Sequence, residues 1–380
     1  MKDFVRQLPG SDLGLARQGS FLRSVHCDGW LLVFLFIVAA IGLITQYSTG
    51  GESLFYVKRQ ALFLTVAFAV MMVVANIPIS ILKRWSPLFY LACLIALVLV
   101  LLIGVGAKGA QRWLSLGFIR FQPSELMKLA LPIVLAYYFS TRTLPPKFIH
   151  VLVSLFLLAL PTALILRQPD LGTSILIATS GLVVVFLAGL AKRYIFGSLA
   201  VLGAAAWPIW QFVMKDYQKQ RVLTLLDPEA DRLGSGWNIW QSKTAIGSGG
   251  LDGKGWLKGT QSQLDFLPEG HTDFAIAALA EEQGFFGVIF VMFCYLLIIS
   301  RGMWISMTAT TSFGRLLAGS ITLTFFMYVF VNIGMVSGIL PVVGVPLPLI
   351  SYGGTSLVTL LAGFGLLMSI ATQDRRRSKR

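Results

Sequence analysis

Several apolar runs in this chain are long enough to cross a lipid bilayer as helices, and they constrain the fold more than any other feature. The first three cover residues 30–46, 61–79 and 87–107. A helix needs about 20 apolar residues to cross a hydrocarbon core, and none of these runs alternates as a membrane-barrel strand does. Only 13% of the 380 residues are charged, about half the share of soluble domains. The sequence therefore predicts an all-α polytopic membrane protein.

Matching the apolar runs to this length predicts about ten transmembrane helices. They fall near residues 30–48, 61–79, 87–106, 126–140, 149–166, 173–190, 194–214, 280–300, 316–339 and 355–372. The expected organisation is an N-terminal tail at 1–29, a transmembrane domain at 30–372 and a basic tail at 373–380. One large extracytoplasmic loop, at about 215–279, separates spans seven and eight. No cleavable signal is expected, because the basic first residues lead directly into a full-length span.

Basic residues indicate the orientation. An even number of spans places both tails on one side, which also receives most basic residues of the short loops. The positive-inside rule makes that side cytoplasmic, so we expect a multi-pass protein of the cytoplasmic (inner) membrane with both termini in the cytoplasm. This placement accounts for the net charge of +14 and gives no reason to expect a nucleic-acid partner. Cys27, Cys93 and Cys294 are odd in number and are expected to be free.

Acidic residues collect on the opposite, extracytoplasmic side, mostly in the large loop. Because charge is costly in hydrocarbon and polar loops tend to carry function, we expect chemistry at this face, with Asp273 at its centre. Ion-coupled transporters usually bury carboxylates at mid-membrane, which these spans almost entirely lack. The loops contain no zinc spacing, Walker loop, nucleophile elbow or Rossmann fingerprint. Carboxylates beside Arg and Lys suit activation of a hydroxyl next to a phosphate-bearing leaving group.

Four segments resemble a known family closely: GAQRWLSLGFIRFQPSE, LRQPDLGTSI, GSGGLDGKGWLKGTQSQLDFLPEGHTDF and VNIGMVSGILPVVGVPLPLISYGGTS. From about residue 30 to 370 the chain resembles the SEDS family of cell-wall polymerases, and within it the branch for cell elongation. The resemblance implies a peptidoglycan glycosyltransferase. Such an enzyme polymerises lipid II, a lipid-linked disaccharide, into a nascent glycan strand at the outer face of the cytoplasmic membrane.

The resemblance also implies roles for particular residues. The family's essential Asp falls on Asp273, the expected general base of an inverting transfer, and other family positions fall on Trp113, Glu125 and Lys128. We expect basic side chains to neutralise the diphosphate of the leaving group. The candidates are Arg112, Lys128, Arg221 and Lys243, and His271 is a further substrate-binding candidate.

A divalent cation, Mg²⁺ or Mn²⁺, is a candidate cofactor near the diphosphate. Asp170, Glu281 and Glu282 are its candidate ligands, although the same carboxylates could equally well only hydrogen-bond the loop.

Structural alternatives remain for the main candidates. Asp273 precedes an apolar helix and would also suit an N-cap or first-turn acid. Glu125 and Lys128 have the spacing of a surface pair that contributes about 0.2 to 0.5 kcal/mol. Trp113 would suit an interfacial anchor, and the loop glycines would suit tight turns as well as a phosphate cradle.

Two other functions compete with the polymerase. A lipid II flippase would need a polar route through the bundle. A scaffold for the elongation machinery would not explain why the acidic residues collect on the extracytoplasmic side. Crosslinking requires a partner, because the chain has no Ser-x-x-Lys motif. The resemblance implies a single-span class B penicillin-binding protein. Small residues favour close helix contact, which makes Gly319, Gly334 and Gly338 candidates for the contact.

Overall fold

Each predicted span falls on a helix. The computed structural model describes residues 26–51, 53–107, 110–115, 120–227, 235–264, 266 and 270–377. The long helices are α2 (Gly29–Thr49), α3 (Leu54–Ala75), α4 (Ile79–Ile103), α5 (Pro123–Ser140), α6 (Phe148–Arg167), α7 (Leu171–Leu187), α8 (Lys192–Pro208), α12 (Ala275–Thr308), α13 (Ser312–Val336) and α14 (Thr355–Arg377). Most of the predicted N-terminal tail and the last three residues lie outside the described residues.

Most of the long helices have the length and composition of membrane spans. In the described part of the chain, eight are long and apolar enough to cross a membrane, with mean hydropathies from 1.4 to 2.7. α7 is a shorter apolar helix of 17 residues, and α5 carries Glu125 and Lys128. The predicted class, an all-α polytopic membrane protein, is confirmed.

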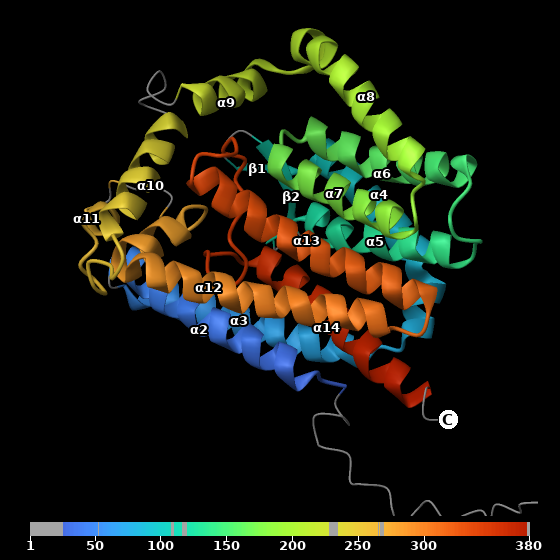
Figure 1. The fold of residues 1–380 in the computed structure, drawn as a ribbon, viewed down its shortest axis with the longest axis horizontal. Coiled ribbons are helices and arrows are strands. Elements are labelled where there is room, and N and C mark those ends of the chain that lie inside the picture. Colours follow the sequence, from blue (N-terminus) through green and yellow to red (C-terminus); the bar gives the residue numbers. More distant parts are fainter. Residues whose placement is uncertain are drawn as a thin grey trace, which may run out of the picture.

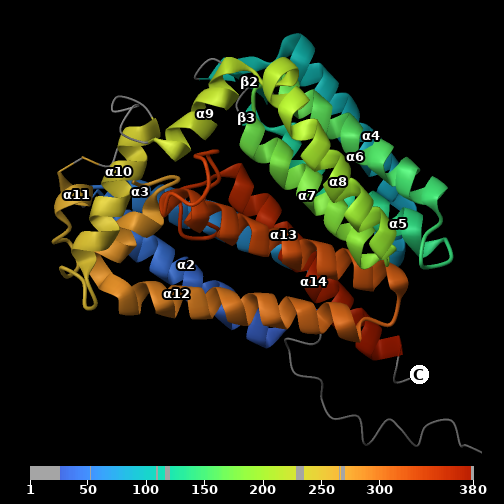
Figure 2. The same ribbon diagram turned by 45° about the horizontal axis from the view of Figure 1, so that its top comes forward.

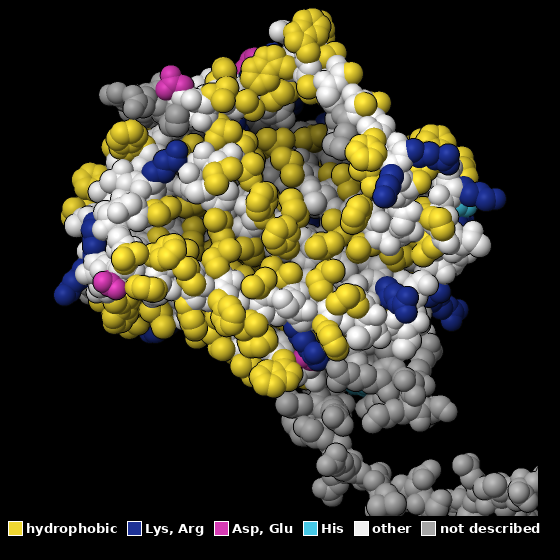
Figure 3. Space-filling view, in the orientation of Figure 1, with side chains coloured by type: hydrophobic (Ala, Val, Ile, Leu, Met, Phe, Trp, Pro, Cys, Tyr) yellow, Lys and Arg dark blue, Asp and Glu magenta, His cyan; other side chains and the backbone are white. Residues whose placement is uncertain are grey.

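The helices pack in two groups that α13 joins. α2, α3, α12 and α14 form one group and α4 to α7 the other, while α13 contacts helices of both (Figures 1 and 2). α8 runs along the edge and continues into a π-helical turn, η1 (Ile209–Val213). None of the most apolar stretch of α8 is buried. Apolar side chains cover much of the face in Figure 3, as a surface against lipid requires.

The start of α2 and the end of α14 lie at the same end of the bundle. His26 Nδ1 and Thr372 Oγ1 are hydrogen-bonded at 2.9 Å, and Arg301 Nη2 donates to Asp28 Oδ2 at 2.6 Å. Helices of the large loop lie at the opposite end (Figure 1). This is the arrangement that an even number of spans predicts. That the end with the termini is cytoplasmic stays a prediction.

The large loop contains helices of its own. They are α9 (Asp216–Leu226), α10 (Ser235–Gly249) and α11 (Thr260–Gln263). α10 packs across α12 and α13, where Ser242 Oγ donates to Val336 O at 2.8 Å. Between α4 and α5 a small antiparallel sheet in the order β1-β2-β3, which the sequence did not predict, joins β1 (Val105–Ala107), β2 (Ala110–Ser115) and β3 (Arg120–Phe121).

Several helix boundaries differ from the predicted spans. α3 begins at Leu54 rather than near 61, and α4 at Ile79 rather than near 87. The apolar pattern marks only the lipid-facing length, whereas a helix continues until its backbone is capped. Ser53 provides such a cap by accepting from Phe55 N at 3.3 Å. α12 likewise begins early, at Ala275, and α14 continues to Arg377 beyond the predicted boundary at 372.

A break interrupts α12 at Gly284, where φ is 66° and ψ is −164°. A Cβ at this position would lie 2.5 Å from the carbonyl oxygen of Leu251, so only glycine fits here. The break separates a short first piece of α12, residues 275–283, from the long apolar piece that follows. Asp273 lies immediately before the short piece.

Candidate functional site

Asp273 lies in the turn that leads into α12, at the loop end of the bundle. It is partly exposed, and the helix N-cap is Phe274, which makes no side-chain cap bond. The assigned N-cap thus falls one residue after Asp273. Gly344, with φ of 75°, faces the carboxylate, because a Cβ there would lie 3.5 Å from Asp273 Oδ2. The absence of a side chain at Gly344 keeps this side of the carboxylate open.

His271 belongs to an aromatic cluster beside the same turn. Its ring centroid lies 5.5 Å from that of Tyr56 and 6.5 Å from that of Tyr352. The guanidinium of Arg59 lies over the Tyr352 ring at 5.9 Å. Burial, the largest influence, raises the pKa of the Tyr352 hydroxyl above its ordinary value of 10, although Arg59 opposes the shift. Tyr352 is therefore neutral at physiological pH.

Arg112 and Asp170 meet where the small sheet approaches the start of α7. Arg112 Nη2 donates to Pro169 O at 2.6 Å, and Arg112 Nε lies 3.7 Å from Asp170 Oδ2. Asp170 Oδ1 also accepts from Thr173 N at 3.2 Å, which caps α7. Trp113 pairs with Val105 in the sheet and is partly exposed. Asp170 thus already has a cation and a helix terminus as partners.

Glu125 and Lys128 form a buried ion pair rather than a surface pair. Lys128 Nζ donates to Glu125 Oε1 at 2.7 Å, and only 5% of Glu125 and 9% of Lys128 are exposed. Thr359 Oγ1 donates to the second carboxylate oxygen at 3.0 Å, and the Lys128 ammonium lies 5.3 Å from the ring centroid of Tyr328. A cavity of about 40 Å³ adjoins Lys128, Tyr328 and Thr359. A paired charge of this kind inside a bundle is a candidate functional position.

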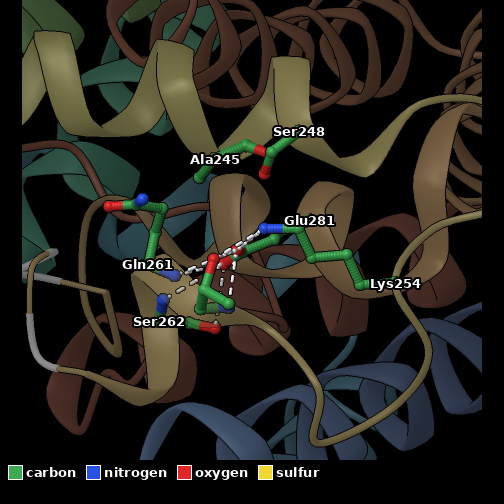
Figure 4. A network of polar contacts seen from close by, with 7 residues as sticks. Ala245, Ser248, Lys254, Gln261, Ser262 and Glu281 are labelled. Atoms are coloured by element: carbon green, nitrogen blue, oxygen red, sulfur yellow. Dashed lines mark hydrogen bonds and ion pairs between the residues drawn. The ribbon is translucent and has the colours of Figure 1, made fainter.

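Glu281 is the centre of a network that fastens residues 250–264, which we call the strap, to the short first piece of α12 (Figure 4). Its side chain is fully buried. Lys254 Nζ and Thr260 N each donate to Glu281 Oε1 at 2.7 Å. Gln261 N donates to Oε1 at 2.9 Å and Ser262 N to Oε2 at 3.1 Å. The carboxylate therefore accepts bonds from a cation and from the first amides of α11.

The three candidate metal ligands each have a different partner in the structure. Glu282 accepts from Ser48 Oγ of α2, Glu281 holds the strap, and Asp170 caps α7. The residues described contain no group of three or more His, Cys, Asp or Glu side chains that could hold a metal ion. Asp170, Glu281 and Glu282 do not fit a shared cation site, and the reading in which they hydrogen-bond their surroundings fits better.

The remaining basic candidates lie on the loop helices. Lys243, on α10, is exposed, and its Nζ would lie 2.7 Å from a Cβ at Gly338. Arg221, on α9, is partly exposed. The segment at 338–354 therefore approaches both Asp273, through Gly344, and Lys243, through Gly338.

Sequence reasoning missed the neutral polar residues at this end of the bundle. Gln46, Gln60 and Asn332 are fully buried in α2, α3 and α13. Only charged residues were considered inside the spans, so these amides were passed over. Their position inside apolar runs was the available signal, since a polar group there needs a partner.

Fold and site together define a multi-span helical membrane protein with a partly exposed carboxylate, Asp273, beside Gly344 and basic side chains on the adjoining loop helices. A family model described as "Cell cycle protein", covering FtsW, RodA and SpoVE, matches residues 24–376. The chain belongs to this family, the SEDS family.

Two sequence relatives belong to the same family. The chain is 51% identical over 361 residues to the peptidoglycan glycosyltransferase MrdB of Escherichia coli K12, covering 95% of this chain and 97% of the relative. It is 36% identical to a probable peptidoglycan glycosyltransferase FtsW of Trichlorobacter lovleyi, covering 92% and 94%.

Two solved structures share the fold. A chain from a structure on polymerization and crosslinking by a peptidoglycan synthase complex superposes with a TM-score of 0.81 at 30% identity, covering 92% of this chain and 98% of that chain. The rod shape determining protein RodA of Thermus thermophilus superposes with a TM-score of 0.69 at 27% identity, covering 91% and 97%.

Proposed function

We propose that this protein is a peptidoglycan glycosyltransferase that polymerises lipid II at the outer face of the cytoplasmic membrane during cell elongation. The observation that carries this is the 51% identity to a peptidoglycan glycosyltransferase over 95% of the chain. The partly exposed Asp273 beside Gly344 supports it, because a transferase needs a carboxylate that an acceptor hydroxyl can reach.

The reaction is an inverting glycosyl transfer. Asp273 takes the proton of the acceptor's 4-hydroxyl as that oxygen forms a bond to the anomeric carbon of the donor sugar. The bond from the anomeric carbon to the diphosphate oxygen breaks, and the polyprenyl diphosphate leaves with the electron pair. Lys243 is the most exposed of the basic candidates to neutralise it, with Arg221, Arg112 and Lys128 as further candidates.

Asp273→Asn tests this assignment, with Asp252→Asn as the matched control, because Asp252 is an exposed acid of the same loop. Both purified variants are given lipid II, and polymer is resolved on a gel. A general base contributes about 10² to 10⁴-fold in rate, so Asp273→Asn should make almost no glycan while Asp252→Asn retains activity. Near-normal polymerisation by a folded Asp273→Asn that still binds lipid II would remove Asp273 from the mechanism.

The alternative function is a lipid II flippase without covalent chemistry. Vesicles containing the protein are assayed for flipping and, in parallel, for polymer. The polymerase needs polymer and does not need flipping. Flipping without polymer under conditions that support binding would favour the flippase.

A class B penicillin-binding protein is the proposed partner, within the elongation machinery. A groove of about 320 Å³ between α12 and α13 includes Gly334, Phe326 and Phe330 in its lining, which supports a transmembrane-helix contact there. Packing within the chain explains all three glycine candidates: a Cβ at Gly319 would meet Leu187 of α7, one at Gly334 would meet Leu340, and one at Gly338 would meet Lys243. The support for a contact at this groove is therefore its apolar lining, in which Phe326 and Phe330 are exposed.

The partner is tested with a purified transpeptidase whose own catalytic serine is replaced. Adding it should raise polymerisation by this enzyme. The variant Phe330→Ala should weaken the complex, whereas Phe156→Ala, on the exposed side of α6, should not. A complex that forms without changing the rate would mean co-localisation rather than activation.

A further inference from the structure

The segment at 338–354, between α13 and α14, has little regular structure, and most of its residues from 345 to 351 are buried. Leu347, Leu349 and Ile350 are at most 1% exposed. Backbone groups at such a place need hydrogen-bond partners from elsewhere, because no strand or helix pairs them and water is excluded. The neighbouring helices must therefore supply donors.

Three buried amide side chains act as those donors. Gln46 Nε2 of α2 donates to Ile350 O at 2.9 Å, and Gln60 Nε2 of α3 donates to Ser351 O at 3.2 Å. Asn332 Nδ2 of α13 donates to Val345 O at 2.7 Å.

Two of the three amides also hold the turn that carries Asp273. Asn332 Nδ2 donates to Asp273 O at 2.8 Å, and Gln46 Nε2 donates to His271 O at 2.9 Å. Each of these NH₂ groups uses both of its hydrogens and bridges the turn to the 338–354 segment. Gln60 has no such bond to the turn and instead accepts from Gly353 N at 3.4 Å.

Each bridging amide leaves its own acceptor unpaired. Asn332 Oδ1 and Gln46 Oε1 are buried and have no hydrogen-bond partner among the described residues. A buried unpaired acceptor costs free energy, but an apolar side chain of similar shape would instead remove the donor from two backbone carbonyls. The part of each amide that the structure uses is therefore its NH₂ group, which joins two backbone segments.

We propose that Asn332 and Gln46 are positioning residues, which fix the backbone of the Asp273 turn against the segment bearing Gly344. This rests on the proposed role of Asp273. The Asp273 carboxylate lies between two chain segments about 70 residues apart, the turn at 271–273 and the segment at 344–350. The two amides hold these segments in one geometry. A base held this way meets the acceptor hydroxyl at a fixed distance.

The test compares Asn332→Leu and Gln46→Met with Gln60→Met as the matched control. Gln60 is equally buried and holds the same segment, but it does not bond the turn. Misplacement of a reacting group by about 1 Å costs about 10²-fold in rate. We therefore expect Asn332→Leu to lower kcat by about that factor with KM little changed. Gln46→Met should have a smaller effect, because His271 O still accepts from Tyr352 N at 2.9 Å. Gln60→Met should keep kcat near wild type.

Thermal unfolding of each variant in detergent establishes that it is folded. Wild-type kcat in folded Asn332→Leu would overturn the proposal, and so would an equal loss of kcat in Gln60→Met, which would indicate general packing. If Asn332→Leu does not fold, Gln46→Met decides, and an unchanged kcat there overturns the proposal. Asp273→Asn is measured alongside. An active Asp273→Asn refutes the base itself, whereas an inactive Asp273→Asn with an active Asn332→Leu refutes only the positioning.

Discussion

Two glycines of the strap provide a matched pair for testing how tightly the strap must pack on the break in α12. Gly253 and Gly250 both have positive φ, 78° and 59°. A Cβ at Gly253 would lie 2.6 Å from the backbone nitrogen of Gly284, whereas one at Gly250 would have nothing within 4 Å. Alanine at either position meets the same left-handed strain, and only Gly253→Ala also collides with backbone.

The expected free energies follow from these geometries. A left-handed backbone costs a non-glycine residue roughly 1 to 2 kcal/mol, and this applies to both variants. Overpacking adds about 1 to 3 kcal/mol, and it applies only to Gly253→Ala. Backbone atoms of α12 cannot move aside as a flexible side chain would, so the clash must displace the strap. The two variants should therefore differ in stability by about 1 to 3 kcal/mol.

The assay is thermal unfolding of both variants in one detergent, with polymerisation of lipid II measured below the lower midpoint. Gly253→Ala should unfold at a lower temperature than Gly250→Ala and lose more activity. Equal midpoints and equal activities would show that the strap is not held closely against α12, and would refute the reasoning.

Three further predictions concern other contacts. Glu281→Gln keeps the shape of the side chain but loses the Lys254 ion pair, so stability should fall by about 1.5 to 3 kcal/mol, the contribution of hydrogen bonds to a charged group. After chelation, adding back Mg²⁺ should change the activity of the wild type and of this variant by the same factor. A loss of the Mg²⁺ response in the variant alone would make Glu281 a metal ligand. Lys128→Met should cost about 3 to 5 kcal/mol by leaving Glu125 buried and unpaired, and adding Glu125→Leu should restore most of the unfolding temperature; no recovery in the double variant would contradict the pairing. Gly344→Ala should reduce kcat because its methyl group reaches the Asp273 carboxylate, whereas Gly51→Ala, at a positive φ in open space, should not; equal kcat values would count against the open side of the site.

The class of protein followed from the sequence because bilayer thickness sets helix length. Each apolar run, such as 30–48, was long enough to need a helix, and each lies on one in the structure. The family was identifiable because its motifs extend over ten or more residues. The ends of the helices were not predictable to the residue, since capping by a side chain such as Ser53 depends on local geometry rather than on hydropathy.

Sequence alone therefore determined the membrane fold, the family and the position of Asp273 at the mouth of the bundle. Tertiary structure decided which groups each polar side chain contacts. It placed Glu281 against the strap rather than in a set with Asp170, buried the Glu125–Lys128 pair, and brought Asn332 to the turn before α12. The physical reason is that each residue's preference for lipid or water belongs to that residue alone, so it can be seen as a pattern along the sequence. A hydrogen bond depends on which segments meet, and residues as far apart as Gln46 and Ile350 meet only once the helices have packed.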